Sequence, residues 1–270
     1  MIHLSHSASA EPELAAAAFG DAPGAWPLPA ASSPRQQWLR AVAAAGQGRY
    51  GAAYADLAAL TRAAPSARLG SLAHSTQASF LRQLGWHGLA RGWDGRALAL
   101  AGDDPEPVAD ALTGLAADAL GVGRLAASAA LLVRADEFVP LAPPRAAVRR
   151  AWIAAELAMV GGAGDDAVRH AESAVELAAA TLGGAARHAA KSQVVLAAAL
   201  CSAGNLDRAR LVGEAALDLT GRLGLVPLRW ALACLLGDLA EAKDRVGELR
   251  AVRDECAMRV ERWGGTWRRP

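Results

Sequence analysis

The sequence has few of the residues that form disulfides or bind metal ions. Only three cysteines occur, Cys201, Cys234 and Cys256. They are widely spaced, and the chain contains no CxxC pair and no cysteine–histidine ligand pair. An odd number of distant cysteines favours neither a disulfide framework nor a zinc site. We therefore expect no metal, no cofactor and a reducing compartment, the cytoplasm.

Aromatic residues make up only 5 % of a chain that is 53 % hydrophobic, because alanine supplies much of the apolar content. Small apolar side chains, with few aromatic or β-branched ones, favour closely packed helices over sheets. Lysine is almost absent as well, since Lys191 and Lys243 are the only two and arginine supplies the other basic residues. This bias is typical of a GC-rich bacterial genome.

Long apolar runs and a strong net charge are also missing. No stretch of 18 or more apolar residues is free of charges, so we expect no membrane span. The first 30 residues have no basic stretch before an apolar one, which argues against a signal peptide. A net charge of +1 argues against a protein that coats nucleic acid or an anionic membrane. We expect neither as a partner.

Catalytic motifs are absent too. The chain has no GxSxG and no HExxH, and its six histidines form no i, i+4 ligand pair. The acidic glycine stretches AGDD and GGAGDD lack the Lys-Ser/Thr of a phosphate loop. Asp103, Asp104, Asp165 and Asp166 are better explained as carboxylates that cap helix N-termini. We do not expect an enzyme.

What the sequence does contain is a recurring glycine turn between Ala-rich segments. The turns are GQGRY (46–50), GWHGL (85–89), GVGRL (121–125), GGAGDD (161–166) and AGNLD (203–207). Their spacing of about 36 to 42 residues indicates an array of helical hairpins. The expected helix pairs are 35–45 with 50–63, 69–84 with 86–100, 106–120 with 125–137, 144–160 with 165–181, 185–202 with 206–223, and 227–240 with 244–263.

Three parts of the chain follow from this pattern. Residues 1–33 are rich in Ala, Ser, Pro and Gly without a helical period, so we expect a disordered N-terminal tail in which Trp26 is the one large anchor. Residues 34–263 form the helical repeat domain. Residues 264–270 are expected to be a C-terminal tail, in which Trp267, together with Trp263, either folds back as a lid or waits for a partner.

The first pair resembles a tetratricopeptide repeat. In WLRAVAAAGQGRYGAAYADLAALTRAAP, Trp38 lies early in the first helix, Gly46 and Gly48 form the turn, Tyr50 follows it, and Pro65 ends the unit. The later units keep the turn and the alanine spacing but are longer than the usual repeat. The resemblance, over roughly 34–261, implies an all-α, right-handed α-solenoid of about six such hairpins. In that family the first helix of each hairpin lines a concave groove, where ligands bind.

Polar residues gather on the predicted groove faces of these first helices. In 69–84, Ser75 and Arg82 share the stripe opposite Leu72, Thr76 and Phe80, with His74 at its edge. The later helices add Arg145, Arg149, Trp152 and Glu156 at i, i+4, i+7 and i+11, and Arg187 and Lys191 at i, i+4. The candidate binding residues are Arg40, His74, Ser75, Arg82, Arg149, Trp152, Lys191 and Arg229.

A cation on most inner helices suits a carboxylate or phosphate, because guanidinium groups bind these groups bidentately. The expected function is a non-catalytic scaffold that binds an acidic peptide, a carboxylate or an acidic partner surface. The alternative is a ligand-sensing regulatory protein of transcription or signalling that lacks its own DNA-binding domain. A plainer interpretation makes these charges a solvated helix face with internal salt bridges, for example from Asp118 to a neighbouring arginine.

Overall fold

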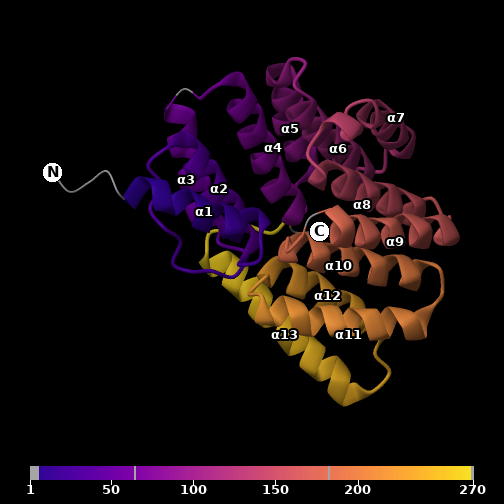
Figure 1. The fold of residues 1–270 in the computed structure, drawn as a ribbon. Coiled ribbons are helices and arrows are strands. Elements are labelled where there is room, and N and C mark those ends of the chain that lie inside the picture. Colours follow the sequence, from indigo (N-terminus) through magenta and orange to yellow (C-terminus); the bar gives the residue numbers. More distant parts are fainter. Residues whose placement is uncertain (1–5, 64, 182, 269–270) are drawn as a thin grey trace.

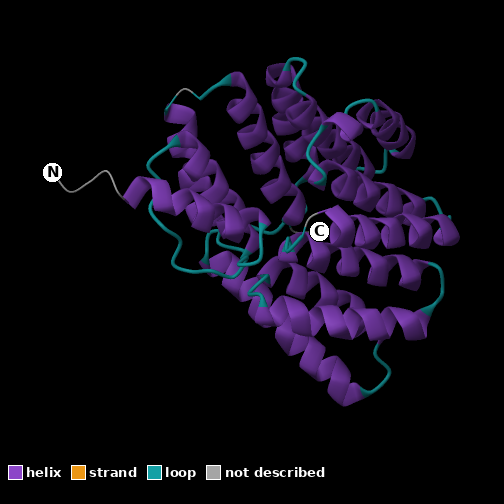
Figure 2. Ribbon diagram, in the orientation of Figure 1, coloured by secondary structure: helices purple, strands orange, loops and turns teal. Residues whose placement is uncertain are grey.

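The structure, a computed structural model, describes residues 6–63, 65–181 and 183–268. In those ranges the regular elements are all helical (Figure 2), and no helix there is both long and apolar enough to cross a bilayer. The helices are α1 (His6–Phe19), α2 (Pro34–Gly46), α3 (Tyr50–Arg62), α4 (Ala67–Gln83), α5 (His87–Ala101), α6 (Pro105–Gly121), α7 (Leu125–Asp136), the 3₁₀ helix η1 (Val139–Leu141), α8 (Arg145–Val160), α9 (Gly164–Thr181), α10 (Ala186–Ser202), α11 (Leu206–Arg222), α12 (Val226–Leu239) and α13 (Lys243–Arg262).

Consecutive helices pack in pairs along the chain, α2 with α3 and so on to α12 with α13. The first helix of each pair also contacts the first helix of the next pair. We call α2, α4, α6, α8, α10 and α12 the inner helices and their partners the outer helices. The bounds of α2 to α13 agree with the sequence-based prediction to within two residues. The all-α class is confirmed, and the packing fits a helical repeat.

A glycine in the left-handed conformation joins each inner helix from α2 to α10 to its outer partner. These glycines have φ between +75° and +87°, and they are Gly48, Gly85, Gly123, Gly162 and Gly204. The residue after each glycine closes the helix end, as when the amide of Arg49 donates to the carbonyl oxygen of Ala44 at 2.9 Å. A side chain would be strained at this φ, which explains why the glycine recurs in the sequence.

Alanine lets these helices approach closely. On α9, Ala167, Ala171, Ala174 and Ala178 form one face, and none of them is more than 6 % exposed. Both α8 and α10 pack against α9. Small side chains at i, i+4 and i+7 therefore form these helix–helix interfaces. The few large side chains lie elsewhere in the protein.

The last helix pair packs against the first, so the array closes into a ring (Figure 1). Val226 of α12 and Val260 of α13 belong to the same core cluster as Trp38 and Tyr50 of the first pair. The amide of Arg268 donates to the carbonyl oxygen of Leu84 at 2.9 Å, which ties the chain end to α4. The shared core of the first and last pairs thus turns the groove of the array into a central cavity.

The N-terminal segment differs from the mobile tail expected for residues 1–33. Residues 6–19 form α1, which packs on α2 and also contacts α10, and Leu14 in this helix is 0 % exposed. A helix with Pro12 inside it and no clear apolar period gives little signal in the sequence. Its stability comes from tertiary packing rather than propensity. The part of the expected tail formed by residues 1–5 lies outside the described residues.

The segment after α1 is held by hydrogen bonds and by a stacked arginine. The Gln47 side-chain amide donates to the carbonyl oxygens of Pro23 (3.0 Å) and Ala25 (2.9 Å). The Arg49 guanidinium lies 3.9 Å from the Trp26 ring centroid and 4.1 Å from that of Trp263. Cation–π contacts on both faces of one guanidinium join the N-terminal segment to the end of α13. Trp26 is thus an anchor.

The C-terminal segment 264–268 is docked as well, although it was expected to be a tail. The carbonyl oxygen of Thr266 accepts a hydrogen bond from the Trp86 indole at 2.7 Å. Trp267 stacks on Trp230 of α12, with ring centroids 4.5 Å apart. This segment therefore folds back against the second and last helix pairs. Residues 269–270 lie outside the described part of the chain.

Candidate functional site

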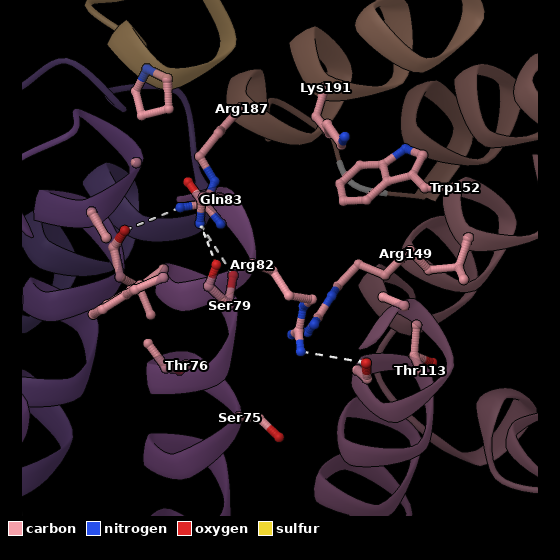
Figure 3. Close-up of a pocket in the computed structure, with 18 of the residues that line it drawn as sticks. Ser75, Thr76, Ser79, Arg82, Gln83, Thr113, Arg149, Trp152, Arg187 and Lys191 are labelled. Carbon is pink, nitrogen blue, oxygen red and sulfur yellow. Dashed lines mark hydrogen bonds between the residues drawn. The ribbon is translucent and has the colours of Figure 1, made fainter. Parts of the chain in front are cut away.

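The inner helices surround a central cavity of about 410 Å³, and each of them contributes to its wall. Phe19, at the end of α1, also lines it. Figure 3 shows Arg82 of α4, Arg149 of α8, and Arg187 and Lys191 of α10 reaching toward this space. The volume lies in the range of small-molecule pockets, roughly 300–1,000 Å³. The cavity is the candidate functional site.

Arg82 is held by two carboxylates from neighbouring helices. It forms ion pairs with Asp94 of α5 and with Asp118 of α6, the latter at 3.1 Å, and both carboxylates are 0 % exposed. Gly114 on α6 makes room for Asp94, because an added Cβ would collide with the Asp94 carboxylate. Arg82 is therefore primarily a structural ion-pair partner, as in the plainer interpretation of the sequence.

The two aspartates around Arg82 share one site. Burial raises the pKa of Asp118 to about 7, and Arg82 opposes this shift. Burial also raises the pKa of Asp94. The neighbouring Asp94 carboxylate raises the pKa of Asp118 as well. Arg82, which pairs with both carboxylates, is thus fully compensated within its own cluster.

A second buried cluster joins α6 to α8. Asp110 accepts from Arg145 at 2.9 Å and from Arg149 at 2.6 Å. Although burial raises its pKa, these two guanidinium groups lower the pKa of Asp110 below its usual value. Arg145 also pairs with Glu106 at the start of α6. Arg149 has Asp110 as its only ion-pair partner in the described part of the chain, so much of its guanidinium faces the cavity.

Arg187 is the cavity arginine that has no carboxylate partner among the described residues. Its side chain crosses from α10 to α2, where Nη1 donates to the carbonyl oxygen of Val42 at 3.0 Å. Val42 is the fifth residue from the C-terminal end of α2, the end of the helix that carries a partial negative charge. Gly46 permits this approach, since an added Cβ would lie 3.0 Å from Arg187 Cδ.

The Arg187 charge is poorly compensated. Burial, followed by the charges of Arg149 and Arg145, lowers its pKa to about 10. Arg187 thus remains a cation at neutral pH, at a point deep in the protein where two other guanidinium groups repel it. Its exposed surface faces the cavity, which is where a compensating anion would reduce this electrostatic cost.

Trp152, His188 and Lys191 form the adjoining wall. The Trp152 indole donates to Ser192 Oγ at 2.9 Å, which fixes its ring, and His188 stacks on that ring with centroids 5.6 Å apart. Burial, followed by the nearby arginines, lowers the pKa of His188 to about 3, so its imidazole is neutral. The Lys191 ammonium lies 5.9 Å from the Trp152 ring centroid and 3.2 Å from Glu156, its ion-pair partner.

Four buried polar atoms of the cavity wall have no hydrogen-bond partner among the described residues. They are Oγ of Ser75, Nδ1 of His87, Oγ1 of Thr113 and Nδ1 of His188, and Ser75, Thr113 and His188 are each only 3 % exposed. Unpaired buried polar atoms are costly and rare in folded proteins. In the described ranges no three metal-ligating side chains lie close enough to hold an ion. The unpaired atoms are therefore suited to hydrogen-bonding an organic ligand.

Of the eight residues predicted to bind a partner, five line the cavity: Ser75, Arg82, Arg149, Trp152 and Lys191. Three do not. Arg40 pairs with Asp56 on α3, and His74 lies against Trp93 of α5. Arg229 lies against Gly221 of α11. These three point from inner helices toward outer ones. The sequence could not show this, because helical spacing alone does not fix how each helix is rotated about its axis.

Three contributors were missed or undervalued. Phe19 belongs to the segment that was expected to be mobile, and nothing in the sequence marks it as a cavity residue. Thr113 contributes a single hydroxyl on α6, and nothing in the sequence distinguishes it as a cavity residue. Arg187 is not among the eight predicted binding residues, although its i, i+4 spacing with Lys191 indicates that both lie on one face of the helix.

Comparison with known proteins adds no further information on this site. No model of a known protein family matches the sequence. No curated protein matches it either. The residues of the cavity are therefore the basis for a functional proposal.

Proposed function

We propose that the protein is a non-catalytic binding module, a right-handed array of about six tetratricopeptide-like hairpins that binds an anionic ligand in its central cavity. The observation that carries this proposal is Arg187, a cation that faces the cavity without a carboxylate partner among the described residues. The proposal keeps the carboxylate-bearing partner expected from the sequence. It replaces the open groove by an enclosed cavity.

The balance of charges in the wall supports an anionic ligand. Five cations line the cavity, Arg82, Arg145, Arg149, Arg187 and Lys191, and all of them except Arg187 pair with a carboxylate of the described residues. In a partly buried cavity an ion pair or charge-assisted hydrogen bond is stronger than at the surface. A ligand carboxylate or phosphate would thus gain more from this wall than a neutral or cationic one.

The size and closure of the cavity favour a small ligand over a long peptide. The space of about 410 Å³ lies inside a ring that the last helix pair closes against the first. An acidic peptide extended along a groove needs an open concave surface. We therefore propose a small organic anion as the ligand.

A second candidate function, a ligand-sensing regulatory protein, is favoured by one contact. Arg187 joins α10 to the end of α2, across the ring, and its hydrogen bond to Val42 lies at the cavity. An anion that binds Arg187 competes with this hydrogen bond. Ligand binding would then change how the first helix pair is held, which is the property that a sensor needs.

A thermal-shift experiment tests the proposed function. We expect octanoate, benzoate or octyl phosphate to raise the melting temperature, because a ligand at about 100 times its Kd stabilises the native state by roughly 2.7 kcal/mol. A peptide of six glutamates should have no such effect. Arg149→Gln should weaken binding of the active anion by on the order of 1–3 kcal/mol.

The matched control is Arg208→Gln. Arg208 lies on the outer helix α11, where it pairs with Glu172 and is half exposed. This variant should bind the anion as well as the wild type does. If none of the anions raises the melting temperature, or if both variants lose binding equally, the cavity is not an anion site and the proposal is wrong.

A further inference from the structure

Resting on the proposed function, we infer that the ligand is a small monocarboxylic acid whose carboxylate binds Arg187 and whose apolar body lies along the aromatic wall of the cavity. Three observations carry this inference. They are the number of uncompensated charges, the unpaired polar atoms of the cavity wall, and the aromatic rings that line the same cavity.

The charge count around Arg187 leaves one positive charge. The linked clusters at this end of the cavity hold four guanidinium groups and three carboxylates, namely Arg68, Arg145, Arg149 and Arg187 against Asp104, Glu106 and Asp110. Neither of the two other cavity cations adds an uncompensated positive charge, because Lys191 pairs with Glu156 and Arg82 pairs with Asp94 and Asp118. The cavity wall can therefore compensate one negative charge on a ligand.

A monoanion is therefore the best electrostatic match. A phosphate monoester carries about −1.5 to −2 charges at pH 7, so it would bring a second, uncompensated negative charge into the cavity. Burying an unpaired charge is strongly unfavourable. A carboxylate carries one charge, and its two oxygens match the donor geometry of a guanidinium group. The carbonyl oxygen of Val42 occupies Nη1 of Arg187 only, so the other donors of this side chain are available.

Polar atoms that need a partner line the same cavity as this arginine. Nδ1 of His188 on α10 is buried and unpaired, as is Oγ1 of Thr113 on α6. The His188 imidazole is neutral, so one of its ring nitrogens carries a proton. A carboxylate oxygen can accept from a hydroxyl or from an imidazole N–H. A carboxylate in the cavity thus offers an acceptor that the wall itself does not supply.

The space next to Arg187 is aromatic. The His188 ring contacts Phe19, at 6.3 Å between centroids, and Trp152, at 5.6 Å, and Phe19 also packs on Trp38 at 5.4 Å. All of these side chains line the cavity. At roughly 30 Å³ for each water-sized group, the cavity holds on the order of a dozen non-hydrogen atoms, and octanoate has about ten. Apolar surface that leaves water for this wall would add affinity.

Calorimetric titration of the full chain with octanoate, octyl phosphate and octanol at one ionic strength tests the inference. We expect octanoate to bind at least tenfold more tightly than either octyl phosphate or octanol. In Arg187→Met, octanoate affinity should fall by at least tenfold while octanol affinity stays unchanged. Arg187→Lys, which keeps the charge, should recover part of the loss, and Arg208→Met should behave as wild type.

Each outcome decides a specific point. If octyl phosphate binds as tightly as octanoate, the single-charge inference is wrong and the proposed anion-binding function stands. If octanol binds as tightly as both anions, the proposed function is wrong as well. Should Arg187→Met not fold, as judged by its circular dichroism spectrum, the wild-type order of the three ligands still decides between a monoanion and a dianion.

Discussion

The amide of Gly51, in the first turn of α3, donates a hydrogen bond of 2.7 Å to the carbonyl oxygen of Trp263, the residue that ends α13. Gly264 follows with φ of +88°, and a Cβ on it would lie 2.9 Å from Gly51 Cα. Two glycines therefore allow the backbones of the first and last helix pairs to touch. The ring, and with it the enclosed cavity, depends on this close approach.

Gly264→Ala should destabilise the protein by about 1–3 kcal/mol, because the added methyl group meets backbone and because φ there is unfavourable for alanine. Urea unfolding followed by circular dichroism measures the change. The control is Gly247→Ala in the second turn of α13, where an added Cβ meets nothing within 4 Å. That substitution should be neutral or stabilise by up to about 1 kcal/mol. Equal effects at both positions would contradict a role of Gly264 in closing the ring.

Asp110→Ala should cost about 3–5 kcal/mol of unfolding free energy, because it leaves Arg149 without an ion-pair partner and Arg145 with Glu106 alone. The measurement is the urea midpoint at constant m-value. Asp166→Ala removes a carboxylate from the exposed pair with Arg169 and should change stability by less than about 1 kcal/mol. A small effect of Asp110→Ala would show that the α6–α8 cluster is not a buried ion-pair network.

Leu14→Ala should destabilise the protein by about 2–5 kcal/mol, since Leu14 of α1 is fully buried in the core that α1 shares with the first helix pair. Deletion of residues 1–33 should likewise lower the melting temperature. The exposed neighbour Glu13 supplies the control, because Glu13→Ala should have almost no effect. A truncated chain that melts at the wild-type temperature would restore the mobile tail expected from the sequence.

Asp118→Asn should change how stability depends on pH. The folded pKa of Asp118, about 7, lies above the ordinary value of 3.8, so the native state binds more protons between these values. Stability contributed by this group is therefore lost as pH rises through that window. Between pH 5 and pH 8 the wild type should lose about 1 kcal/mol or more relative to the variant.

The comparison is made on unfolding free energies of both proteins at both pH values. His87 and His188 have lowered pKa values and give the opposite slope, but they are present in both proteins and cancel in the difference. Arg82 and Asp94 face Asp118 and also remain in both. If the two pH dependences are parallel, the pKa of Asp118 is not raised in the folded protein.

Part of the site could be predicted from spacing alone. Arg149 and Trp152 share one face of α8, and Lys191 lies one turn after Arg187 on α10, so each group points in one direction once the helix is known. What spacing could not give is the partner of each cation. Arg82 pairs with Asp94 and Asp118 on two other helices, and this pairing changes it from a free ligand-binding group into a structural one.

The sequence by itself determined the helices and their turns, because both depend on contacts within a few residues. Left-handed glycines such as Gly48 and Gly85 and the spacing of alanines are local signals, and they survive without knowledge of the fold. Only the tertiary structure decided that α1 packs into the core, that Trp263 meets Gly51, and that Arg187 is left without a carboxylate. These features depend on segments far apart in the chain, where packing of whole helices fixes which side chains meet and which remain uncompensated.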